Sequence, residues 1–205
     1  MQWVQYFICG WALAFIGVAI PGLVNMTVAN QSMRHGFKAG LLACTGASFV
    51  IFLQAKIAVG FSHYLSVHAE VLTNIKIVAI LIFLILSAVF FYQALRPKVQ
   101  RGKSNAASPM LRGIAASGMN VLNIPFYFTA TAYLEARGWI IFRPYSGWWV
   151  ALGAGVGAYA ILWLYAYMAG YLTRHAPAIS RGANYFLSVL FLLLAFVQWI
   201  QLYFV

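Results

Sequence analysis

The chain has 205 residues, of which 64% are hydrophobic and 7% are charged. Soluble domains carry about 25% charged residues, so this sequence cannot cover a water-exposed surface on all sides. Most of its surface is therefore predicted to face the lipid bilayer. The net charge of +11 does not indicate nucleic-acid binding, because the basic residues lie in short gaps between long apolar runs.

The sequence carries no pattern typical of a metal site or of a phosphate-binding loop, such as C-x-x-C, H-E-x-x-H or G-x-x-x-x-G-K-[ST]. Its two cysteines, Cys9 and Cys44, lie within apolar stretches, where thiols behave as small hydrophobic groups. The chain has no Asp, and its histidines lie at the edges of the apolar runs, so the sequence shows no acid–base catalytic pair. We therefore predict no cofactor, no metal site and no enzymatic activity.

The apolar runs predict about six transmembrane helices, because crossing the hydrocarbon core takes about 20 mostly apolar residues. In chain order the runs cover residues 3–30, 39–61, 71–95, 111–133, 145–172 and 184–204. They are continuously apolar and do not alternate with polar residues, which favours helices over strands. The predicted fold class is an all-α polytopic membrane protein.

The basic residues are distributed unequally between two sets of connections. Nine lie in the first, third and fifth connections, and two lie in the fourth. The nine are Arg34, Lys38, Arg96, Lys98, Arg101, Lys103, Arg112, Arg174 and Arg181, and the two are Arg137 and Arg143. Since cytoplasmic loops are rich in Lys and Arg, the first, third and fifth connections are predicted to be cytoplasmic, with both termini outside.

A basic, polar linker over residues 96–110 divides the chain into a first half, residues 1–95, and a second half, residues 111–205. Each half contains three predicted helices, and an odd number of helices gives the two halves opposite orientations in the membrane. This inverted 3+3 repeat is typical of many secondary transporters.

The first helix of each half contains residues that interrupt helices. They are Pro21, Gly22 and Asn25 in the first run and Asn120, Asn123 and Pro125 in the fourth. Proline removes a backbone donor and clashes with the carbonyl one turn earlier. The freed carbonyls and the neighbouring amides could bind the amine and the carboxylate of a zwitterion, which predicts a substrate site. Simple proline kinks without a ligand are the alternative.

Two lysines, Lys56 and Lys76, lie inside predicted helices, within about two turns of their outer ends. A lysine at the membrane centre costs about 2.5–3.5 kcal/mol. One interpretation is that both side chains extend to the membrane surface. The other is that one of them faces a cavity, where it attracts a carboxylate or takes part in ion coupling.

The sequence resembles the lysine-exporter (LysE/RhtB) family of bacterial amino-acid exporters. The P-G-P motif of that family is matched by Pro21-Gly22-Leu23, its G-[FR]-x-x-G turn by the segment from Gly36 to Gly40, and its Asn-Pro motif by Asn123-Ile124-Pro125. Leu23 replaces the second proline, and Ile124 separates the Asn from the Pro. The acid that many members carry in the second helix is missing from the region Ser48-Phe49-Val50-Ile51.

The resemblance implies a secondary transporter in the bacterial cytoplasmic (inner) membrane that exports amino acids or similar small metabolites. Its mechanism would be alternating access, by rocking of one half against the other around the substrate. The partners would be the small-molecule substrate and either a second copy or a membrane complex. An alternative is a non-transporting membrane subunit that anchors or braces a larger complex, which the scarcity of charge within the membrane favours.

Overall fold

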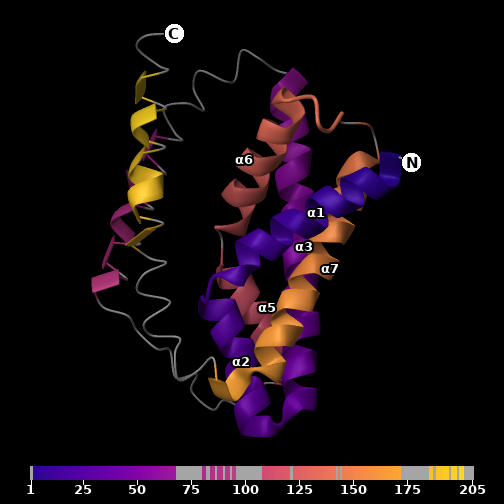
Figure 1. Ribbon diagram of the computed structural model, residues 1–205, viewed down its shortest axis with the longest axis vertical. Coiled ribbons are helices and arrows are strands. Elements are labelled where there is room, and N and C mark those ends of the chain that lie inside the picture. The colour runs from indigo at the N-terminus through magenta and orange to yellow at the C-terminus, as the bar shows by residue number, and fades with distance from the viewer. Residues whose placement is uncertain are drawn as a thin grey trace. The chain divides into compact units, whose positions relative to one another are not determined.

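The computed structural model describes residues 2–67, 108–120, 122–141, 143 and 145–171, and parts of the segments 80–95 and 185–200. Within these residues the regular structure is entirely helical, in agreement with the predicted all-α class. The labelled helices are α1 (Gln2–Ala19), α2 (Leu23–His35), α3 (Phe37–Val67), α5 (Pro109–Met119), α6 (Asn123–Ala136) and α7 (Ser146–Tyr167) (Figure 1).

The helices follow the predicted segments, with two interruptions. The predicted second and fifth helices correspond to α3 and α7, and each is continuous over most of its predicted length. The predicted first helix consists of α1 and α2, and the predicted fourth consists of α5 and α6. The linker over residues 96–110 lies largely outside the described residues, and the third and sixth predicted helices lie partly outside them. The interruptions therefore occur in the two helices in which the sequence predicted them.

Three of the described helical stretches are long and apolar enough to cross a membrane: Gln2–Ala19, Phe37–Ser62 and Ser146–Tyr167. The helices α2, α5 and α6 have 13, 11 and 14 residues, which is short of the roughly 17–25 that a span needs. Because α5 and α6 together follow one predicted span, their interruption explains why neither qualifies alone. The total of six spans and the position of the termini remain predictions.

The chain divides into two compact units. The first comprises Met1–Tyr64 and Gln100–His175, and the second comprises Leu65–Val99 and Ala176–Val205. In the second unit, the Ser87 hydroxyl donates to the Ser188 carbonyl at 2.9 Å, and the Ser188 hydroxyl donates to the Ser87 carbonyl at 3.0 Å. This reciprocal pair joins the predicted third and sixth helices to each other.

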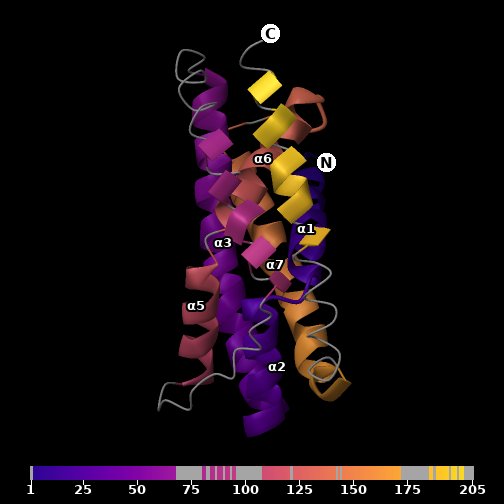
Figure 2. The same cartoon turned by 90° about the vertical axis from the view of Figure 1, so that its left-hand side faces the viewer.

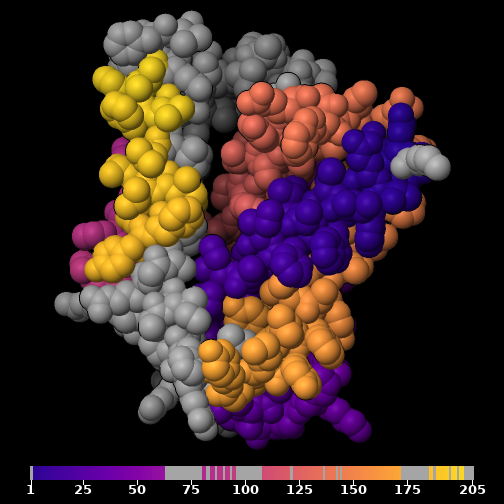
Figure 3. Space-filling view, in the orientation of Figure 1, coloured from indigo at the N-terminus to yellow at the C-terminus, as the bar shows by residue number. Residues whose placement is uncertain are grey.

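Glycines bring α1 into backbone contact with α7 in the first unit, and α1 crosses over α7 in the space-filling view (Figure 3). A Cβ atom on Gly10 of α1 would overlap the carbonyl of Val150, and one on Gly153 of α7 would overlap the carbonyl of Phe7. In lipid, where apolar helices gain little by avoiding solvent, such close approach is a main source of helix association.

The same kind of contact joins α3 to α5, which lie side by side (Figure 2). A Cβ atom on Gly46 of α3 would overlap the carbonyl of Met110, and one on Gly113 of α5 would overlap the carbonyl of Ala43. Each interrupted segment therefore places its first helix against the long helix of the other half, α1 against α7 and α5 against α3.

The contact at Gly113 predicts a steep cost for the smallest side chain. Gly113→Ala places a methyl group on the Ala43 backbone, which cannot move as a flexible side chain would, and we expect a loss of about 1–3 kcal/mol of stability. Gly118, on the same helix, has open space around its Cα atom. Gly118→Ala is the matched control, and its helix propensity makes it neutral or stabilising by up to about 1 kcal/mol. Thermal unfolding in detergent measures both, and equal melting temperatures would contradict the close crossing.

Candidate functional site

The first interruption lies between Ala19, where α1 ends, and Leu23, where α2 begins. Pro21 is buried there, and Gly22 caps α2 with an extended backbone, at φ −137° and ψ −167°. Proline has no N–H to continue the helix. In a continuous helix the carbonyls of Val18 and Ala19 would accept bonds from Gly22 and Leu23, and the interruption leaves them in need of other donors.

Two side chains supply those donors. The amide of Asn25, itself buried on α2, donates from Nδ2 to the Val18 carbonyl at 2.5 Å. The Tyr165 hydroxyl of α7 donates to the Ala19 carbonyl at 2.8 Å. Without water, an unpaired carbonyl at this depth would cost several kcal/mol, on the order of a lost hydrogen bond in an apolar medium. The interruption is therefore stabilised partly from its own segment and partly from α7.

The second interruption lies between Met119 and Asn123, and a buried glutamine of α3 is at its centre. Gln54 donates from Nε2 to the Ser117 carbonyl at 3.1 Å and to the Asn120 carbonyl at 3.3 Å. Asn123 donates from Nδ2 to Gln54 Oε1 at 2.8 Å, and Asn120 donates from Nδ2 to Asn123 Oδ1 at 3.2 Å. Three amide side chains thus form one connected network over the end of α5.

Pro125 does not cause this second interruption. It is the third residue of α6, and the first turn of a helix tolerates proline because its N–H groups have no partner within the helix. The Pro125 carbonyl accepts a bond from the Thr129 hydroxyl at 2.8 Å. The break in the helix precedes Pro125: α5 ends at Met119, and the Gln54 amide donates to the carbonyl of Asn120 just after it.

The two interruptions approach each other through one aromatic ring. A Cβ atom on Gly17, just before the first interruption, would lie 2.8 Å from Cε1 of Phe126, just after the second. All six residues predicted to bind substrate lie in the first unit. In the described part of the chain, the hydrogen bonds of one interruption do not include residues of the other.

Two buried hydroxyl groups near the interruptions have no hydrogen-bond partner among the described residues. They belong to Ser117, at the end of α5, and Tyr127, on α6. Tyr127 is 1% exposed and is packed in the same apolar cluster as Val18 and Val24, which flank the first interruption. A buried hydroxyl without a partner costs about 1–3 kcal/mol. A polar ligand that forms a hydrogen bond with either group would remove that cost.

Lys56 lies away from both interruptions. It follows Gln54 by two residues, or about 200° around α3, and its ammonium group lies 4.8 Å from the centre of the Trp148 ring at the start of α7. No contact with the amide network therefore supports a role of Lys56 in substrate binding or ion coupling. Lys76 lies outside the described residues. Among the residues that are described, no cluster of His, Cys, Asp and Glu is suited to hold a metal.

Sequence reasoning missed three residues of this site. Gln54 stood out only as a polar residue within an apolar run, and nothing in the sequence connects it with Asn123, 69 positions away. Tyr165 and Tyr127 had no local signal, because tyrosines are common in membrane helices as packing or interface residues. Their roles depend on contacts between helices that are distant in the sequence.

A family model described as LysE type translocator matches residues 15–201 of the chain. The match starts within α1 and includes both interruptions and the two long helices α3 and α7. Comparisons with curated proteins and with solved structures gave no match.

The amide network predicts a large effect of Gln54→Leu. This variant leaves the Asn123 amide without its acceptor and removes the Gln54 donor from the carbonyls of Ser117 and Asn120, and we expect a loss of about 1–3 kcal/mol of stability. Thr45→Val on the same helix is the control, because the Thr45 hydroxyl bonds only to the carbonyl of Leu41, one turn earlier in α3. Denaturation in mixed micelles measures both. Combining Gln54→Leu with Asn123→Leu should cost less than the sum of the single changes, and strict additivity would argue against the network.

Proposed function

The chain belongs to the LysE type translocator family, and on that premise we propose that it exports amino acids or similar small metabolites through a path between its two interrupted helices. The family makes the protein an integral membrane transporter. The observation that carries the finer proposal is the pair of interruptions, each supported by a polar side chain from the opposite half, Tyr165 at the first and Gln54 at the second.

The chemistry around the interruptions suits a zwitterion. Amide side chains offer both N–H donors, which suit a carboxylate, and carbonyl acceptors, which suit an ammonium group. Asn25 and Asn123 each lie just after an interruption, beside the carbonyls of Val18 and Asn120, which accept no bond from the following turn of a continuous helix. The hydroxyls of Tyr127 and Ser117 add two buried groups that a substrate could engage.

Alternating access fits the way these bonds are distributed. The bond from Tyr165 to Ala19 and the bonds from Gln54 to Ser117 and Asn120 join residues of different halves of the chain. When one half rocks against the other, these are the contacts that exchange, and a substrate that replaces them lowers the cost of the movement.

The proposal predicts efflux of labelled amino acids from proteoliposomes that contain the purified protein. Tyr127→Phe removes a hydroxyl without a partner in this conformation, so it should leave the melting temperature unchanged or raised while efflux falls several-fold. Asn123→Ala should reduce efflux at least about tenfold, a loss of roughly 1.4 kcal/mol of interaction. Tyr145→Phe, at an exposed position, is the control and should export normally.

Efflux of no amino acid by the folded wild-type protein would contradict this proposal and favour the non-transporting subunit. Normal efflux by both single variants, Tyr127→Phe and Asn123→Ala, would be compatible with a transporter but would place its substrate path away from the second interruption.

A further inference from the structure

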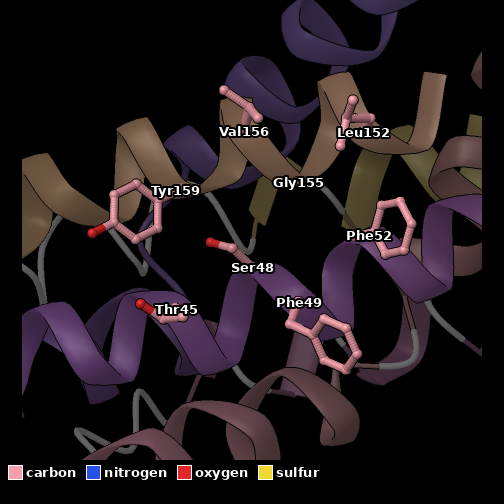
Figure 4. A pocket seen from close by; sticks show the side chains of 8 residues that line it. All are labelled: Thr45, Ser48, Phe49, Phe52, Leu152, Gly155, Val156 and Tyr159. Atoms are coloured by element: carbon pink, nitrogen blue, oxygen red, sulfur yellow. The ribbon is translucent and has the colours of Figure 1, made fainter. Parts of the chain in front are cut away.

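A groove runs along α3 and α7 and is formed by two adjoining hollows. One has a volume of about 270 Å³ and lies between Ser48 and Tyr159 (Figure 4). The other has a volume of about 450 Å³ and lies among aromatic side chains at the start of α7. Phe52 and Leu152 line both hollows, so the two adjoin each other along α3 and α7.

The groove has the length and the character of a lipid-chain site. From Tyr145 to Tyr159, its extent along α7 is about 21 Å at 1.5 Å per residue, which exceeds the roughly 15 Å of one leaflet of the hydrocarbon core. Its lining is almost entirely apolar, and Leu152 and Val156 are nearly half exposed there. Gly155 also lines the first hollow. A Cβ atom at that position would lie 3.1 Å from Cβ of Phe52.

A positive charge lies beside the aromatic end of this groove. Lys56 follows Phe49 and Phe52 at helical spacing on the same face of α3, and its ammonium group lies over the ring of Trp148, which lines the groove. In the described part of the chain no carboxylate pairs with Lys56. Aromatic residues gather at the level of lipid headgroups, where an unpaired ammonium group attracts phosphate.

We propose that this groove binds an anionic phospholipid, with an acyl chain along α3 and α7 and the phosphate beside Lys56. A second copy of the chain fits the same face less well. A two-fold interface uses the same patch on both copies, so it would bring two Lys56 side chains to one interface. The chain has only two acids, Glu70 and Glu135, and Glu135, the one that the structure describes, does not line the groove.

The test is native mass spectrometry of the full-length protein in detergent, titrated with phosphatidylglycerol or phosphatidylcholine of identical acyl chains. The wild-type protein should retain phosphatidylglycerol more tightly. Lys56→Gln should weaken phosphatidylglycerol binding about fivefold and leave phosphatidylcholine unchanged. Lys38→Gln, at the opposite end of α3, is the matched control and should change neither. Leu152→Trp, which fills the junction of the two hollows, should weaken both lipids.

Equal wild-type affinity for the two lipids, or equal effects of Lys56→Gln and Lys38→Gln, would overturn the proposal. A protein that is dimeric until Leu152→Trp makes it monomeric would also overturn it, because the groove would then belong to a second copy. Since Lys56 and Leu152 have no contact with the amide network, the result is independent of the efflux measurements.

Discussion

A backbone carbonyl that loses its helical partner inside a membrane finds no water to replace it, and the first unit of this protein is organised around that constraint. Both interrupted segments end a helix in the middle of an apolar run, and both freed sets of carbonyls are satisfied by side chains. Asn25 contributes from within the first interrupted segment, and at the second the Asn120 amide binds the side chain of Asn123. Tyr165 and Gln54 contribute from the long helices of the opposite halves, so neither half is complete without the other.

The exchange between halves extends to packing. The first helix of each interrupted segment crosses the long helix of the other half, and glycines bring the backbones into contact at Gly10 and Gly153 and again at Gly46 and Gly113. The predicted third and sixth helices pair with each other in a separate unit. Exchanging the two halves of the chain maps each of these features onto its counterpart, as an inverted repeat requires. The predicted inverted repeat would account for this correspondence, and the proposed rocking between two arrangements rests on that repeat.

The sequence predicted the helical class and the approximate extents of α3 and α7, because the length of an apolar run reflects the thickness of the bilayer. It also predicted that the first and fourth runs are interrupted, from the local chemistry of Pro21 and Gly22 and of Asn120, Asn123 and Pro125. It did not predict that Pro125 lies in the first turn of α6, where proline does not interrupt the helix, because that depends on where the helix begins. The partners Gln54 and Tyr165 could not be predicted from the sequence, because side-chain contacts between distant helices follow from packing rather than from local pattern.

The proposed transport path depends on opposite orientation of the two halves in the membrane. The most direct measurement is a topology map of the full-length chain, with reporters that are active on only one side of the membrane. A reporter fused after Val205 should be active outside the cytoplasm, and one inserted within residues 101–108 should be active inside it. Both reporters on the same side would contradict the inverted arrangement of the two halves, and the reversed pattern would contradict the predicted orientation of the chain.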